Sequence, residues 1–161
     1  MLPEVAAGNS AAAEIDNRVP DAIVGAKKET DGLSLSIAPN RIAEVCRILK
    51  DSADFERLGA VTAVDWWPRE PRFEVVYFLH SLKQNTRLRL NLRVRQDDEV
   101  ESVCSVWRGA NWYEREVFDL FGIRFRNHPN LERIMMPVDW EGHPLRKDYP
   151  VHGHKYSYQD E

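Results

Sequence analysis

The chain has 161 residues, 30% of them charged, and a formal net charge of −4. This length suits one compact domain with an additional segment, and the acidic balance argues against a nucleic-acid footprint over the whole surface. The two cysteines, Cys46 and Cys104, are too few to hold an iron–sulfur cluster, and no stretch is apolar for long enough to span a membrane. We therefore expect a soluble protein whose link to any membrane runs through partners.

The first predicted elements follow a segment with little apolar periodicity. Residues 1–32 are rich in alanine and acidic residues and are interspersed with glycine and proline, which predicts a flexible leader with room for a short helix. Residues 33–37 alternate between apolar and polar side chains, a pattern typical of a strand. Pro39 then opens a predicted helix, because a proline at the first helical position gives up no hydrogen bond.

The middle of the chain predicts a sheet of consecutive strands. Strict alternation or β-branched and aromatic residues predict strands over residues 58–67, 73–79, 87–95 and 100–103. Short connections between these segments favour antiparallel pairing. A second helix is predicted over residues 106–121 and ends at Gly122. The predicted fold class is therefore α+β, an antiparallel sheet of about four or five strands covered by two helices, with an extended C-terminal tail.

The composition changes after Gly122. Prolines recur at short intervals and exclude a long helix or a central strand, while large apolar residues remain frequent. An extended segment with spaced apolar residues lies along a surface, either of its own domain or of a neighbouring protein, and composition leaves both open. The chain thus divides into a flexible leader (1–32), an α+β domain (33–122) and an extended, partner-wrapping tail (123–161).

Three groups of residues suggest chemistry. The arginines of the strand over residues 87–95 form either a phosphate-binding groove or ion pairs across the sheet, and the second is favoured because no aromatic stacking platform accompanies them; they are Arg87, Arg89, Arg93 and Arg95. The spacing of the histidines matches no metal site; they are His128, His143, His152 and His154. On the second helix Arg115 and Asp119 are expected to pair, being four residues apart. We expect no catalytic residue and no metal ligand.

The C-terminal third of the chain resembles the C subunit of NADH–quinone oxidoreductase, a part of respiratory complex I with counterparts in mitochondria and chloroplasts. The resemblance rests on residues 110–125, 128–131, 133–134 and 140–150. Glu132 departs from the family pattern, in which a basic residue or proline is expected. The order of residues 61–65 and 75–77 is compatible with the same family.

The resemblance implies a non-catalytic peripheral-arm subunit of a proton-translocating NADH–quinone oxidoreductase, on the cytoplasmic face of the bacterial inner membrane. Such a subunit has no cofactor of its own, because FMN and the iron–sulfur clusters belong to other subunits. It docks on the D subunit foremost, with the B and I subunits nearby, binds no nucleic acid and reaches the membrane only through the complex. The expected partner-binding residues are Glu114, Arg115, Glu116, Asp119, His128, Pro129, Arg133, Trp140, Gly142, His143, Pro144, Leu145, Arg146, Lys147 and Asp148.

Two other functions remain open from the sequence. The same fold and tail also suit a membrane hydrogenase or another dehydrogenase with a D-like partner. A stand-alone phosphate or nucleic-acid binder using the strand arginines is the other alternative. For the tail itself, Arg146 and Asp148 are expected to form ion pairs with the partner, which fix register and orientation.

Overall fold

A five-stranded sheet forms the centre of the structure, a computed structural model that describes residues 2–150. Its strands are β1 (Ile23–Glu29), β2 (Gly32–Ile37), β3 (Arg57–Asp65), β4 (Phe73–Ser81) and β5 (Thr86–Val94). Their spatial order is β1-β2-β5-β4-β3, and all neighbours are antiparallel except β2 and β5, which run parallel. The α+β class is confirmed. The sheet is mixed instead of antiparallel, because the connection from β2 to β3 crosses over through a helix.

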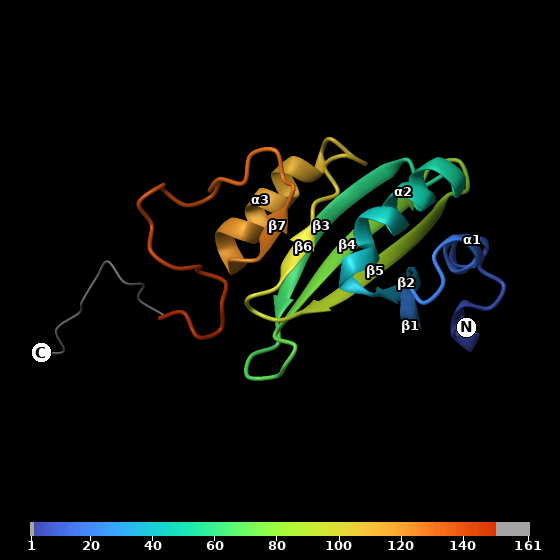
Figure 1. Ribbon diagram of the computed structural model, residues 1–161, viewed down its shortest axis with the longest axis horizontal. Helices are drawn as coiled ribbons and strands as arrows, with labels where there is room; N and C mark the ends of the chain where they lie inside the picture. The colour runs from blue at the N-terminus through green and yellow to red at the C-terminus, as the bar shows by residue number, and fades with distance from the viewer. Residues whose placement is uncertain (1, 151–161) are drawn as a thin grey trace, which may run out of the picture.

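Three α-helices accompany the sheet: α1 packs against α2, and α3 packs against β3. They are α1 (Ser10–Arg18), α2 (Ile42–Ser52) and α3 (Ala110–Phe121), with short 3-10 turns η1 (Glu4–Ala6) and η2 (Pro39–Arg41). Helix α2 buries Ile42, Val45 and Leu49 at helical spacing, so this side of the helix belongs to the core. Figure 1 shows α1 and α3 at opposite ends of the molecule, with α2 between them.

The N-terminal segment differs from the flexible leader expected over residues 1–32. It contains α1 and the edge strand β1, and the Asn9 side chain caps α1 by accepting a hydrogen bond from the Ala12 N–H at 3.0 Å. Helix α1 packs on α2 through Ile15 and small alanines. An alanine-rich buried surface of this kind produces only a weak apolar period, which explains why composition suggested a leader.

Helix α3 begins four residues later than residue 106, where the sequence placed it, and is preceded by turns. The N–H groups of Val106 and Trp107 both donate to the Val103 carbonyl, and the two side chains are buried. The burial of these two side chains made the sequence before Gly109 resemble a helix. Gly109 is the residue that directly precedes α3. A parallel pair of short strands flanks α3, β6 (Glu99–Glu101) and β7 (Arg124–Arg126).

The two faces of the sheet have different surroundings. Leu88, Leu90 and Leu92 of β5 are buried on the face that meets the helices, which is the inner face. On the outer face Arg57 is exposed and Val64 of β3 is 39% exposed, so no helix covers this side at β3. The alternation read from the sequence therefore gives the correct inner face.

The segment after β7, residues 127–150, contains neither helix nor strand and is called the strap below. Figure 1 shows it running around α3 at the end of the molecule remote from α1. His152 and His154, considered above as metal ligands, lie outside the described residues. None of the helices within residues 2–150 has the length and apolar content needed to cross a bilayer.

Candidate functional site

The strap caps the C-terminal end of α3. The last carbonyl groups of an α-helix lack partners within the helix and carry the negative end of its dipole. The Leu145 N–H donates to the Leu120 carbonyl at 3.0 Å. The Arg146 Nε donates to the Phe121 carbonyl at 2.6 Å and adds a positive charge where the dipole favours one. The end of α3 is thus completed by residues from the strap.

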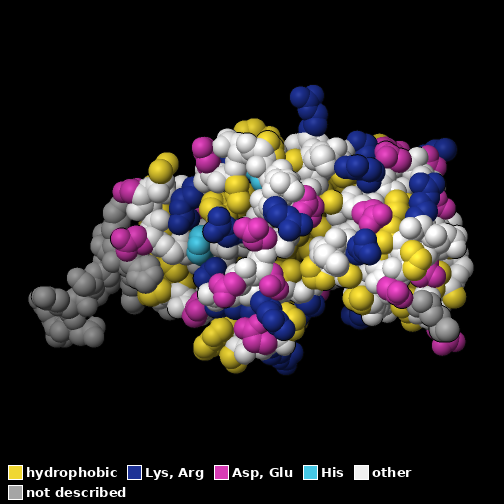
Figure 2. All heavy atoms as spheres, in the orientation of Figure 1, with side chains coloured by type: hydrophobic (Ala, Val, Ile, Leu, Met, Phe, Trp, Pro, Cys, Tyr) yellow, Lys and Arg dark blue, Asp and Glu magenta, His cyan; other side chains and the backbone are white. Residues whose placement is uncertain are grey.

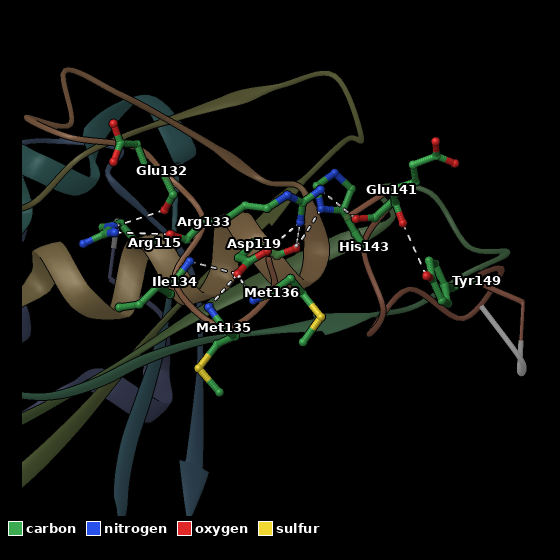
Figure 3. A network of polar contacts seen from close by, with 11 residues as sticks. Arg115, Asp119, Glu132, Arg133, Ile134, Met135, Met136, Glu141, His143 and Tyr149 are labelled. Atoms are coloured by element: carbon green, nitrogen blue, oxygen red, sulfur yellow. Dashed lines mark hydrogen bonds and ion pairs between the residues drawn. The ribbon is translucent and has the colours of Figure 1, made fainter. Parts of the chain in front are cut away.

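Asp119 of α3 is fully buried and binds the middle of the strap. Its Oδ2 accepts hydrogen bonds of 2.7 to 3.0 Å from three consecutive backbone N–H groups, those of Ile134, Met135 and Met136. Its Oδ1 accepts from Nη1 of Arg133 at 2.5 Å (Figure 3). Burial raises the pKa of this carboxyl, but these donors outweigh burial and hold the pKa below its ordinary value. We call this arrangement the Asp119 clasp.

A second buried carboxylate binds the far end of the strap. Asp65, at the end of β3, forms an ion pair of 2.8 Å with Arg72, and both side chains are almost fully buried. Arg72 also pairs with Asp148 of the strap at 2.6 Å, and the Lys147 N–H donates to Asp65 at 2.9 Å. Burial raises the pKa of Asp65, but the bonds from Arg72 and the backbone lower it to about 2. This arrangement is the Asp65 clasp.

Gly122 lets the strap approach the end of α3 closely. Its φ of 76° is left-handed, as expected for the residue that ends a helix. A Cβ at this position would lie 2.6 Å from the ring of His143 and would overlap the guanidinium of Arg146. Both the backbone conformation and the lack of a side chain are therefore required here.

Glu114 of α3 is buried beside the first residues of the strap. Its carboxylate accepts from the Ser102 hydroxyl at 2.6 Å and from the Val103 N–H at 2.8 Å. The Cys104 Sγ lies 3.4 Å from the same carboxylate, and the His128 Nε2 lies 3.9 Å from it. Burial raises the pKa of Glu114 above its ordinary value, and no Lys or Arg within residues 2–150 offsets the loss of water.

The side chains of Cys104, Glu114 and His128 place one potential ligand atom each within 4.8 Å of one another. Their hydrogen bonds, however, fit a structural role. The His128 Nδ1 accepts the Asn130 N–H, so the ring proton is on Nε2, which donates to the Asn111 carbonyl at 3.2 Å. Burial also raises the pKa of Cys104 to about 12, which disfavours the thiolate that a metal requires. We interpret this cluster as the attachment of the start of the strap.

The predicted partner-binding residues divide between contacts within the chain and the surface. Polar contacts to this chain's own residues are made by Glu114, Arg115, Asp119, His128, Arg133, His143, Arg146 and Asp148. Exposed residues without such a role for their side chains are Glu116, Pro129, Gly142, Leu145 and Lys147. Trp140 and Pro144 are half-buried. The structure thus brings most of the polar candidates together around the end of α3.

One expected pairing is not found, and one residue expected to pair with a partner has an ion pair within the chain. Arg115 does not pair with Asp119 but donates to the carbonyls of Glu132 and Arg133, because Asp119 lies on the buried side of α3. Asp148, expected to pair with a partner protein, pairs with Arg72 of its own chain. The ion pairs of the strap therefore hold it on its own domain.

Large apolar side chains remain exposed on α3 and the strap. They are Trp112 (61% exposed), Met135 (58%), Val138 (95%) and Leu145 (51%), which we call the strap surface. The Arg115 guanidinium lies over the Trp112 ring, 5.3 Å from its centre, and restricts its position. Figure 2 shows hydrophobic side chains at the surface in this end of the molecule. Exposed apolar groups on a segment held rigidly from beneath are typical of a protein contact site.

Sequence reasoning missed Asp65 and Arg72. The signal for Asp65 was present, because Val61, Ala63 and Asp65 occupy alternate positions of β3 and all three are buried. A charged residue on the inner face requires a partner. No local pattern indicates that this partner is Arg72 together with the strap.

Comparisons with known proteins find matches over most of the chain. The family described as respiratory-chain NADH dehydrogenase, 30 Kd subunit, matches residues 35–155. The C subunit of NADH-quinone oxidoreductase from Cereibacter sphaeroides is 45% identical over 152 residues, which are 93% of this chain and 76% of that protein. The corresponding C subunit from Geobacter sulfurreducens is 42% identical over 92% of this chain and 93% of its own length.

A solved structure shows the same fold. It is the membrane-bound sulfane sulfur reductase, an archaeal respiratory membrane complex, in which one chain superposes with a TM-score of 0.73 and 29% sequence identity. The similarity covers 86% of this chain and 83% of that chain. The shared part therefore includes most of the domain described above.

Proposed function

The chain belongs to the family of the 30 Kd subunit of respiratory-chain NADH dehydrogenase, and from this we propose that it is a non-catalytic subunit of a proton-translocating NADH–quinone oxidoreductase. The match over most of the chain carries this proposal. Within such a complex the subunit supports electron transfer from NADH to quinone without holding a cofactor, while FMN and the iron–sulfur clusters are held by other subunits. It lies in the peripheral arm, on the cytoplasmic face of the inner membrane.

The strap surface is the proposed docking site for the D subunit, with the B and I subunits nearby. The support is structural: the Asp119 and Asp65 clasps fix the strap, so Met135 and Leu145 of the strap, like Trp112 of α3, are presented in a defined arrangement before any partner arrives. A preorganised surface loses less conformational entropy on binding than a free tail does. In this proposal, the polar residues that were predicted to contact the partner contribute by holding the strap in place.

The test is a pair of matched double variants in the host membrane. We expect Trp112→Ser with Leu145→Ser to lower the amount of this chain that co-purifies with the D subunit at least about fivefold, because exposed aromatic and aliphatic groups dominate interface energy. The matched control is Trp67→Ser with Leu82→Ser, at residues 49% and 58% exposed elsewhere on the chain.

Both double variants should keep the melting temperature of the parent chain, since all four side chains are exposed. Equal recovery of the D subunit with the strap-surface variant and with the parent would refute the docking proposal. A loss of recovery in the control as large as in the strap-surface variant would do so as well.

A second candidate is a subunit of a respiratory complex of the sulfane sulfur reductase type. The structural match to a chain of that complex favours it, although the 45% identity to the protein from Cereibacter sphaeroides exceeds the 29% identity found there. The two functions differ in the proteins that co-purify and in the electron donor. Membranes that lose NADH–quinone reductase activity when this chain is deleted support the first function, and membranes that keep this activity support the second.

A further inference from the structure

Three basic residues form a row across the outer face of the sheet. Arg57 of β3 is directly opposite His80 of β4, and His80 is directly opposite Arg87 of β5. Residues directly opposite each other in antiparallel strands point to the same face. The two arginines are two strand spacings apart, roughly 10 Å. The row lies at the end of β3 remote from Asp65 and therefore remote from the Asp65 clasp.

This row lacks the acidic partners that the other outer-face arginines have. Arg89 pairs with Asp31 at 3.6 Å, and Arg93 pairs with Glu74 at 3.4 Å. For those two arginines the expected pairing across the sheet is confirmed. Arg57 and Arg87 form no ion pair within residues 2–150. Arg57 and Arg87 each lie directly opposite His80, so an anion bound between them would meet two cations that have no ion-pair partner among the described residues.

A hollow of about 350 Å³ opens beside the row. Phe78 and Gly59 line it together with the three basic residues, and Arg89 lies over the Phe78 ring, 4.9 Å from its centre. A Cβ at Gly59 would lie 3.3 Å from the Phe78 carbonyl oxygen, so this lining position has little room for a side chain. The volume suits one or two side chains and combines an apolar floor with a positive rim.

The opposite rim of the hollow is acidic. Glu29 and Asp31, at the turn between β1 and β2, line it there. A long polyanion such as RNA would be repelled by this rim and by the net charge of −4. A short peptide avoids this repulsion, because a single carboxylate can lie between Arg57 and Arg87 while its neighbours in the chain are neutral or apolar.

We propose that this hollow binds an acidic segment of a partner protein, with a carboxylate held between Arg57 and Arg87 and an adjacent apolar side chain on Phe78. The site is separate from the strap surface, so this proposal does not depend on the docking role proposed above. It gives the molecule a second contact, on the sheet, in addition to the one at the end of α3. Binding by charge at this place would fix the orientation of the partner.

The experiment is a titration of the ¹⁵N-labelled full chain, followed by amide chemical shifts. The probe is a blocked tetrapeptide with a single carboxylate, alanine–glutamate–leucine–alanine, and the control peptide has glutamine in place of the glutamate. We expect saturable shifts at Gly59, Phe78 and His80 with the acidic peptide only. Equal binding of the glutamine peptide overturns the proposal, as do shifts that do not saturate. Inorganic phosphate or a single-stranded oligonucleotide that binds the same residues more tightly than the peptide also overturns it.

Variants connect the shifts to the row. Arg57→Glu with Arg87→Glu should weaken peptide binding at least about tenfold, because both cationic contacts become repulsive. Arg95→Glu with Arg108→Glu changes the net charge equally at exposed positions outside the hollow and should leave affinity within about twofold. All four arginine positions are exposed, so both variants retain the fold. Equal loss in both double variants would show a non-specific charge effect and refute the site.

Discussion

Asp119 supplies the hydrogen-bond acceptors that a segment without regular structure otherwise lacks. The N–H groups of Ile134, Met135 and Met136 have no helix or strand partner, and a buried N–H without an acceptor is destabilising. An ionised carboxylate has about four acceptor positions and can serve all three together with Arg133. A single buried side chain thereby fixes the path of four consecutive strap residues.

The acid stability of the chain should depend on Asp65. Its pKa is lowered from 3.8 to about 2 in the folded state, so its stabilising effect is present above about pH 4 and is lost as the pH falls toward 2. The shift corresponds to about 2 kcal/mol. We expect Asp65→Asn to lower the free energy of unfolding at pH 7, and this difference from the parent to narrow between about pH 4 and pH 2. Urea unfolding across this range measures it.

The control for this prediction is the exposed Asp51, on α2. Asp51→Asn should change the free energy of unfolding by less than about 0.5 kcal/mol at pH 7. A constant difference between Asp65→Asn and the parent from pH 7 to pH 2 would contradict the assignment of the acid transition to Asp65.

Single residues differ in how far the sequence predicts them. Gly122 was predicted as the end of α3 from the helical period before it, and its φ of 76° with an N–H bond to the Phe118 carbonyl confirms this. The pairing of Arg72 with Asp148 was not predictable, because these residues are 76 positions apart and no local pattern encodes their distance. Asp119, Arg133 and Asp148 were singled out by residue type and Asp65 and Arg72 were not, and the contacts of all five required the structure.

At the scale of elements, local pattern predicted those with strong periodicity. Strand β5 and helix α2 alternate or repeat clearly, and both are present as expected. Strand β1 was missed because it has no strict alternation, and the short helix allowed for in the leader was not placed because α1 buries mainly alanine. Packing against α2 and pairing with β2 stabilise these two elements, and neither contact is visible in a local window.

The junction of α3 and the strap should be sensitive to one added methyl group. Gly122→Ala places a Cβ on His143 and Arg146 and imposes a left-handed φ on alanine. We expect it to lower the free energy of unfolding by about 2 kcal/mol or more. Thermal or urea unfolding of the full chain measures this, and limited proteolysis within residues 127–150 shows release of the strap.

The other end of the same helix provides the control. Gly109 has ordinary helical angles, and nothing lies within 4 Å of a Cβ built there. Gly109→Ala should therefore leave stability unchanged or raise it by up to about 1 kcal/mol. An equal change in the free energy of unfolding for Gly109→Ala and Gly122→Ala would contradict a stabilising role for the close contact between Gly122 and the strap.

At the scale of the whole molecule, the strap joins parts that are distant in sequence. The Asp119 clasp attaches it to α3, and the Asp65 clasp attaches it to the end of β3 and the start of β4. The α+β class followed from the sequence because alternation and helical period show the layers. The parallel pairing of β2 with β5 did not follow from the sequence. It depends on the direction in which the long connection after β2 crosses the sheet.

Removal of the strap should destabilise the domain that remains. Truncation after Arg126 leaves the buried Asp119 without its donors and Arg72 without Asp148, and it exposes the last carbonyls of α3. We expect the free energy of unfolding to fall by at least about 3 kcal/mol, which corresponds to a fall in melting temperature of about 10 °C. Calorimetry of the truncated and full chains tests this. An unchanged melting temperature would mean that the strap is an independent tail, as the sequence division at residue 123 suggested.

The cap on α3 also sets the order in which the molecule is completed during synthesis. Helix α3 leaves the ribosome before Leu145 and Arg146 do. The carbonyls of Leu120 and Phe121 therefore have no hydrogen-bond donors from the strap until the strap has been synthesised. Met135 and Leu145 of the strap surface reach their final positions only when the strap has packed against α3. A nascent chain that stops before Leu145 therefore leaves the end of α3 without these donors and lacks part of the strap surface.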